Sequence, residues 1–154
     1  MRKGRYLLDV NVLIALTDDE HEHYQAAMQW FNTSGKHDFG ACALTEAGYL
    51  RVVSRPSAAG LTIEQATAVL ADLARQPGYR FWPIVDPWST LTAPLAARIF
   101  GHQQVTDAIL LGLAVKENGI LVTFDQGIRY LAGPQFSKNI LVLESASRST
   151  SPQA

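Results

Sequence analysis

The sequence predicts an α/β fold in which a mostly parallel sheet is covered by helices on both faces. Short continuous apolar runs alternate along the chain with longer segments whose apolar residues recur every three or four positions. Such continuous runs are typical of strands buried on both faces, as they are in parallel sheets. We find no internal repeat and expect a single domain over residues 1–144. The Ser- and Thr-rich end, residues 145–154, is expected to be a flexible tail.

The first half of the chain is expected to contain two strands, over 6–8 and 39–44, and four helices, over 12–16, 21–31, 45–53 and 62–74. The first strand is an apolar run that stops at Asp9, and apolar residues three and four apart give the second helix one apolar face. Thr45 is suited to cap the third helix. Thr62, with Gln65 three residues later, forms a capping box for the fourth.

The second half is expected to contain three strands, over 79–85, 120–124 and 140–143, helices over 89–99 and 105–117, and a turn or short helix over 125–131. The helix over 105–117 is strongly apolar, and Asn118-Gly119 after it is a typical helix C-cap. Strands therefore alternate with helices along the whole chain, which favours parallel pairing.

Composition excludes several classes of protein. Lys and Arg number 13 and Asp and Glu 14, so the formal net charge is −1 and the chain is not a polybasic nucleic-acid binder. Any contact with nucleic acid needs a local basic patch. Cys42 is the single cysteine, which excludes an internal disulfide framework and a cysteine-based zinc site. No apolar run is long enough to span a membrane, so we expect a cytoplasmic protein.

Four acidic residues stand where predicted strands end or where the next helix begins: Asp9, Glu46, Asp107 and Asp125. Each one alone can be explained as a helix cap or as a complement to a helix dipole. In a parallel sheet, however, these positions share one edge, and two carboxylates about 4 Å apart repel by roughly 4 kcal/mol. Such a group needs a cation, and carboxylate-rich oxygen ligation suits Mg²⁺ or Mn²⁺ rather than zinc.

Asn11 adds a neutral oxygen two residues after Asp9, where it is placed to orient that carboxylate or to bind metal-bound water. A metal ion in such a site can activate water and stabilise a leaving oxygen. The chain contains no GxxxxGK[ST], GxGxxG, GxSxG or HExxH motif, which argues against P-loop, dinucleotide-binding, serine-hydrolase and zinc-protease chemistry. Phosphodiester hydrolysis is the reaction class that remains.

The chain resembles the PIN-domain ribonucleases and, within them, the VapC toxins of VapBC toxin–antitoxin modules. The resemblance extends roughly from Tyr6 to Leu143, and it is carried by residues 8–14, 45–53, 105–108 and 121–127. His23 with Trp30 also resembles the early helix of one VapC subgroup. Ile109 is a departure, because many relatives have a histidine after the Asp-Ala pair. The resemblance implies a three-layer α/β/α sandwich.

The resemblance also implies a role for each acidic residue. Asp9 and Asp107 would be direct ligands of Mg²⁺ or Mn²⁺, and Glu46 and Asp125 would complete or orient the set. It further implies that small polar residues lie beside the metal, and the matching positions here are Asn11 and Thr123. The implied activity is endoribonuclease cleavage of RNA by the toxin of a type II module. The implied partners are a cognate antitoxin and a second copy of the chain.

Substrate contacts and rival functions remain open. Arg51 and Arg129, with Arg55, Arg98 and His102, are candidates for a basic rim that binds RNA phosphates, although scattered solvated charges explain them equally simply. Trp82, Trp88 and Phe100 are suited either to stack on bases or to pack in the core. The alternatives to a ribonuclease are a non-catalytic PIN-like module that binds RNA or protein and another Mg²⁺-dependent phosphohydrolase, such as a phosphatase.

Overall fold

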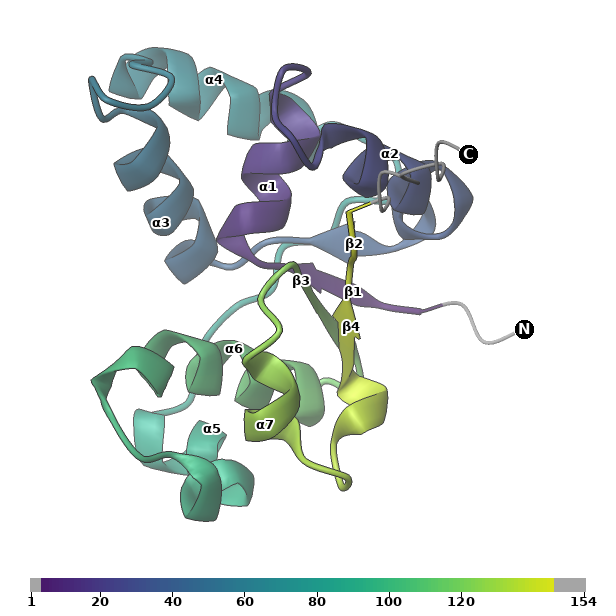
Figure 1. The fold of residues 1–154 in the computed structure, drawn as a ribbon, viewed down its shortest axis with the longest axis vertical. Helices are drawn as coiled ribbons and strands as arrows, with labels where there is room; N and C mark the ends of the chain where they lie inside the picture. Colours follow the sequence, from purple (N-terminus) through teal and green to yellow (C-terminus); the bar gives the residue numbers. More distant parts are fainter. Residues whose placement is uncertain (1–3, 146–154) are drawn as a thin grey trace, which may run out of the picture.

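The computed structural model describes residues 4–145 of the 154-residue chain. A parallel sheet lies between two layers of helices, so the predicted α/β sandwich is confirmed (Figure 1). The elements in chain order are β1 (Tyr6–Leu8), α1 (Val10–Thr17), α2 (Tyr24–Thr33), η1 (Gly35–His37), β2 (Phe39–Gly40), α3 (Ala43–Val53), α4 (Ile63–Ala74), α5 (Trp88–Thr92), η2 (Ala93–Arg98), η3 (His102–Gln104), α6 (Val105–Lys116), β3 (Ile120–Thr123), α7 (Ile128–Ala132), η4 (Ser137–Asn139) and β4 (Ile140–Val142), where η marks a 3₁₀ helix.

The sheet has four strands in the order β2-β1-β3-β4, and every neighbouring pair is parallel. In the centre of the sheet, Leu7 pairs with Leu121 and Leu8 pairs with Val122. The backbone N–H of Asp9 continues this ladder by donating to the carbonyl of Val122 (3.0 Å). The carboxyl ends of β1 and β3 therefore lie side by side, which is where ligands bind in parallel α/β sheets.

Alternate residues of the central strands supply two separate cores. Leu8 and Val122 face a cluster formed with α1, α2, α3 and α4, whereas Leu7 and Leu121 face one formed with α5, α6 and α7. All four side chains are fully buried. Figure 1 shows the corresponding helix layers above and below the sheet. This burial on both faces explains why the strands are continuous apolar runs.

Two of the predicted strands are wrong in extent or in kind. The strand expected over 79–85 is reduced to an isolated bridge between Tyr79 and Phe39, although Arg80 N and Trp82 N donate to backbone carbonyls beside β2. The pairing goes no further because the neighbouring segment enters α3 at Ala43. The strand expected over 39–44 stops at Gly40, because the next helix begins at Ala43.

Helix boundaries also differ from the prediction in three places. Helix α3 begins earlier than expected because the Thr45 hydroxyl accepts a hydrogen bond from Cys42 N (3.1 Å), so Thr45 caps the helix from within its first turn. Helix α1 starts at Val10 with Asp9 as its N-cap. The helix expected over 89–99 is divided into α5 and η2, with Pro94 at the start of the second part.

Within residues 4–145, none of the helices is long and apolar enough to cross a bilayer. The predicted flexible tail falls outside the described residues from position 146 onward.

Candidate active site

Asp9 lies at the end of β1 and is held in place by both of its carboxylate oxygens. Its Oδ1 accepts from the backbone N–H of Val10 (2.7 Å), which caps α1. Its Oδ2 accepts from the hydroxyl of Thr123 at the end of β3 (2.7 Å). The residue is only 9% exposed. The carboxylate is therefore fixed in orientation at the junction of the two central strands.

The Thr123 hydroxyl connects the ends of β1 and β3. It donates to Asp9 and accepts from the Asn11 amide (3.2 Å) and from the backbone N–H of Asp125 (3.0 Å), so its single proton and both lone pairs are used. The Asn11 Oδ1 accepts from the backbone N–H of Phe124 (3.1 Å). Asn11 and Thr123, both predicted as supporting residues, therefore lie beside Asp9 and orient it.

Asp9, Asp107 and Asp125 lie close enough together for neighbouring charges to raise the pKa of Asp107 and of Asp9. Burial, followed by the charges of Asp9 and Asp125, raises the pKa of Asp107 from its ordinary 3.8 to about 6. Burial also raises the pKa of Asp9, with a smaller contribution from Asp125, while hydrogen bonds from Thr123 and Val10 oppose the rise. These effects place three of the four predicted acids in one electrostatic cluster.

Glu46 lies in the first turn of α3 and stands apart from this cluster. Burial alone raises the pKa of Glu46. The pKa of the Tyr79 phenol is raised by burial and, next in size, by the charge of Glu46. Sequence reasoning missed this neighbour, because residues 79–85 were expected to form a strand of the sheet. The nearest charge effect of Glu46 is therefore on Tyr79, and none of the three aspartates contributes to the shift of its own pKa.

The chemistry of this group fits a hard divalent cation. Carboxylate, amide and hydroxyl oxygens are the donors that Mg²⁺ and Mn²⁺ prefer. Burial and then repulsion from Asp9 and Asp125 raise the pKa of Asp107, and a bound cation would offset both costs of its charge. As the side chains stand, no three His, Cys, Asp or Glu residues of the described chain are close enough together to hold one ion. Within residues 4–145 the side chain of Asp107 takes part in no hydrogen bond or ion pair, so none has to be broken for it to turn toward the other acids.

Three further charged residues, Arg51, Arg129 and Asp86, are described by their exposure and their ion pairs. Arg51 is exposed on α3, and the guanidinium of Arg129 forms an ion pair with Glu144 (3.5 Å). Asp86, an acid that follows the predicted strand 79–85, pairs with Lys116. Lys116 is nine residues beyond Asp107, which is about 14 Å along a helix. Asp86 is thus held at the opposite end of α6 from Asp107.

A second feature that the sequence analysis did not predict is a stack beside the acidic cluster. The ring of His23 packs on that of Phe124 with centroids 4.5 Å apart and an interplanar angle of 16°. Phe124 lies between Thr123 and Asp125, and His23 also contacts Ser145. The stack joins the start of α2 to the end of β3 and supports the backbone that carries Asp125.

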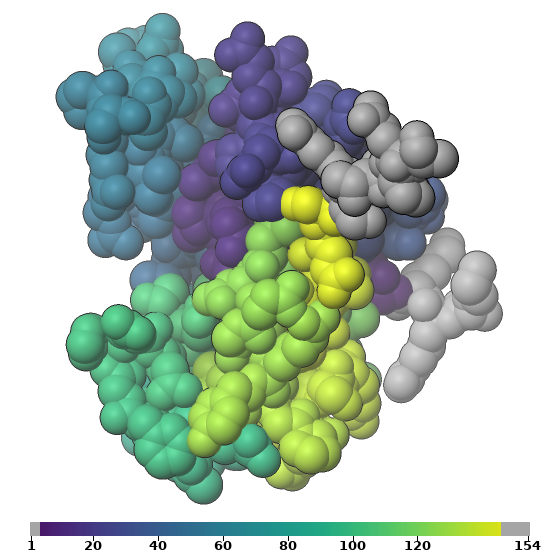
Figure 2. All heavy atoms as spheres, in the orientation of Figure 1, coloured from purple at the N-terminus to yellow at the C-terminus, as the bar shows by residue number. Residues whose placement is uncertain are grey.

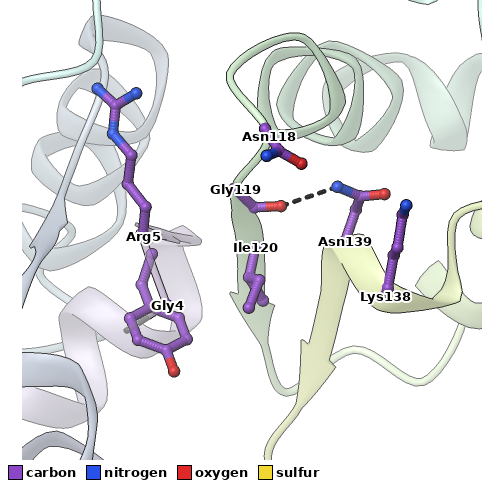
Figure 3. A pocket seen from close by; sticks show the side chains of 8 residues that line it. Gly4, Arg5, Asn118, Gly119, Ile120, Lys138 and Asn139 are labelled. Atoms are coloured by element: carbon purple, nitrogen blue, oxygen red, sulfur yellow. Dashed lines mark hydrogen bonds between the residues drawn. The ribbon is translucent and has the colours of Figure 1, made fainter. Parts of the chain in front are cut away.

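The two edges of the sheet differ in shape and chemistry. Figure 2 shows a hollow in the surface between the blue residues of α3 and the green residues that lead into α6, with the purple residues of α1 at its base. The opposite edge has a pocket of about 300 Å³ at the amino ends of the strands (Figure 3). Arg5, Asn118 and Lys138 line this pocket together with Asn139, whose amide donates to Gly119 O (3.0 Å). No acidic residue lines this pocket, in contrast to the carboxyl edge, where Asp9, Asp107 and Asp125 lie.

Comparisons with known proteins agree with the geometry. A family model described as the PIN domain matches residues 6–134. Ribonuclease VapC44 of Mycobacterium tuberculosis is 36% identical over 138 residues, covering 89% of this chain and 97% of the relative. Ribonuclease VapC38 of the same organism is 40% identical over 128 residues, covering 82% of this chain and 89% of the relative.

Solved structures show the same fold at low identity. VapBC2 from Rickettsia felis, bound to a DNA fragment from its promoter, aligns with a TM-score of 0.61 at 14% identity, covering 90% of this chain and 98% of that chain. VapC20 of Mycobacterium tuberculosis, a toxin that cleaves the sarcin–ricin loop, aligns with a TM-score of 0.60 at 11% identity, covering 80% of this chain and 92% of that chain.

Proposed function

Since the chain belongs to the VapC ribonucleases of the PIN-domain family, we propose that it hydrolyses RNA with a Mg²⁺ or Mn²⁺ ion held by Asp9, Asp107, Glu46 and Asp125. The observation that carries this proposal is the electrostatic cluster at the carboxyl edge of the sheet. Burial, together with the charges of neighbouring aspartates, raises the pKa of Asp107 and of Asp9, so this group is costly to keep charged without a cation. Asp9 also caps α1, but that role requires neither Asp107 nor Asp125 beside it.

Each side chain has a separate part in the proposed site. Asp9 and Asp107 are the direct ligands, and Glu46 and Asp125 complete the set. The Thr123 hydroxyl donates a hydrogen bond to Asp9 Oδ2. This bond favours the charged form of the carboxylate and fixes its orientation. When bound, a divalent ion supplies an activated water and neutralises charge on the phosphodiester.

The substrate and partners follow from the family. RNA is the substrate, and Arg51 and Arg129 are proposed to contact its phosphates, which for Arg129 requires exchange of the ion pair with Glu144. The VapC relatives and the structural neighbours that contain VapBC complexes support a cognate antitoxin as partner. A homodimer and a cytoplasmic location complete the proposal for a type II toxin.

The proposal is tested by incubating the purified chain with single-stranded and structured RNA in the presence of Mg²⁺, Mn²⁺ or EDTA. We expect metal-dependent cuts that are absent in EDTA and reduced at least a hundredfold in Asp107→Asn, since loss of a charged ligand removes both affinity and orientation. Asp86→Asn is the matched control and is expected to cleave normally.

Two outcomes would contradict the proposal. Metal binding without cleavage of any RNA would favour the non-catalytic binding module, and release of inorganic phosphate from a small monoester would favour a phosphatase.

A further inference from the structure

Two exposed aromatic rings lie against each other on the segments that carry the acidic cluster. Phe100 is 74% exposed and Tyr130 is 56% exposed, and their ring centroids are 6.0 Å apart at an interplanar angle of 44°. Phe100 lies in the loop that leads into α6, whose first turn contains Asp107. Tyr130 lies on α7, which begins three residues after Asp125. We call Phe100 and Tyr130 the aromatic pair.

The loop that carries Phe100 is held by a single glutamine. The Gln104 Oε1 accepts from the backbone N–H groups of Phe100 (2.6 Å) and Gly101 (3.3 Å), and its amide donates to the carbonyl of Arg98 (3.0 Å). These bonds close residues 98–104 into a compact turn immediately before α6. The Phe100 ring is therefore presented to solvent by an ordered backbone, and a ligand that binds it needs to order little of the protein.

A cation accompanies the rings. The guanidinium of Arg98 lies 5.7 Å from the centre of the Tyr130 ring and donates to the Tyr130 carbonyl (3.0 Å). On the other side of Phe100, a hollow of about 290 Å³ is lined by residues 100–104, which include His102. Exposed rings beside an arginine are the combination that binds unpaired nucleotides, because bases stack on the rings and phosphates pair with the cation.

We propose that the aromatic pair is a stacking platform for unpaired bases of the RNA, with Arg98 contacting an adjoining phosphate. This inference rests on the proposed function, which makes RNA the substrate. A second copy of the chain is the rival occupant. The two rings expose on the order of 250 Å² between them, whereas a stable dimer buries about 800 Å² on each partner. The size of the pair and its neighbouring cation favour a few nucleotides.

The test measures binding separately from cleavage. In EDTA, fluorescence anisotropy follows a labelled single-stranded oligoribonucleotide and an abasic strand of the same length and charge. Phe100→Ala and Tyr130→Ala are expected to weaken binding of the base-containing strand about fivefold to a hundredfold. Phe100→Trp is expected to retain the affinity, and Phe81→Ala, which removes another exposed phenylalanine, is the matched control. The abasic strand is expected to bind wild type and variants equally.

Three results would overturn the platform: unchanged affinity in Phe100→Ala, an equal loss for the abasic strand, or a change of oligomeric state in light scattering with RNA affinity unaltered. Cleavage in Mn²⁺ is measured in parallel so that the two proposals fail separately. RNA that binds through the rings but is never cut would overturn the nuclease and keep the platform. If wild type and Phe100→Ala bind and cut the RNA equally, the platform would be overturned and the nuclease kept.

Discussion

Replacing Asp107 by asparagine is expected to stabilise the metal-free protein at neutral pH. Burial and the charges of Asp9 and Asp125 raise the pKa of Asp107 from 3.8 to about 6, so the folded state holds its proton more tightly than the unfolded state. Two pKa units correspond to about 3 kcal/mol, which we reduce to about 1–2 kcal/mol because the side chain is partly exposed. Asparagine removes the charge that causes this cost.

The sign of the effect with pH follows from the same pKa values. Well below pH 3.8, Asp107 is protonated in both the folded and the unfolded state and its charge costs nothing, so wild type and variant differ only by the intrinsic effect of the substitution. As the pH rises from 4 through 6, the folded wild type is forced to release its proton and loses stability, and above about pH 6 the difference is constant.

Chemical denaturation of both proteins in EDTA at pH 4.5 and 7.5 measures this difference. An advantage of Asp107→Asn that grows by about 1 kcal/mol between the two pH values supports this explanation, and the full 1–2 kcal/mol at pH 7.5 corresponds to a gain in Tm of about 3–6 °C. Asp86→Asn, which removes the charge paired with Lys116, is expected to show no such gain. Equal stability of Asp107→Asn and wild type at both pH values would refute the reasoning.

Three further predictions concern the surroundings of Asp107. Thr123→Val is expected to lower the free energy of unfolding by about 1–3 kcal/mol and to weaken Mn²⁺ binding, because it removes the hydroxyl that donates to Asp9 Oδ2. Thr123→Ser keeps the hydroxyl and is expected to behave as wild type in denaturation and calorimetry. At subsaturating Mn²⁺, the initial rate of RNA cleavage is expected to fall below about pH 6 as Asp107 becomes protonated, so a rate that is flat down to pH 5 would contradict its role as a ligand. His23→Ala is expected to cost about 0.5–1.5 kcal/mol through loss of the stack on Phe124, and His23→Phe is expected to recover it in the same denaturation experiment.

The geometry also shows why Asp107 is a better probe than Asp9. In Asp9→Asn, the new amide N–H₂ would face a Thr123 hydroxyl whose two lone pairs already accept from Asn11 and from Asp125 N. That substitution therefore breaks a hydrogen-bond network as well as removing a charge, and any change in stability mixes the two effects.

The layer arrangement and the gathering of Asp9, Asp107 and Asp125 were predictable because both follow from short-range patterns. Buried parallel strands appear in the sequence as apolar runs, and residues that directly follow such strands lie at the same edge of the sheet. Asp9, for example, directly follows an apolar run and is also the cap of the next helix. These features depend only on residues that are close in sequence.

The features that were missed depend on contacts between distant segments. The stack of His23 on Phe124 and the effect of Glu46 on Tyr79 arise from packing between elements that periodicity does not relate. The strand expected over 79–85 was wrong because the segment it would pair with ends as a strand at Gly40 and enters α3 at Ala43, which the apolar composition of 79–85 does not show. Glu46 was expected to join the other acids on the strength of its position after β2, and this stays a prediction; the effect of its charge on Tyr79 could not be seen from the sequence.

Calorimetric titration of the folded protein with Mn²⁺ tests the central claim most directly, because it requires neither a known RNA target nor turnover. The account predicts saturable binding by wild type and by Asp86→Asn, and affinity reduced at least tenfold in Asp107→Asn without loss of the folded state. Equal Mn²⁺ affinity in wild type and Asp107→Asn, or no binding by the folded wild type, would show that the acidic cluster is not a metal site.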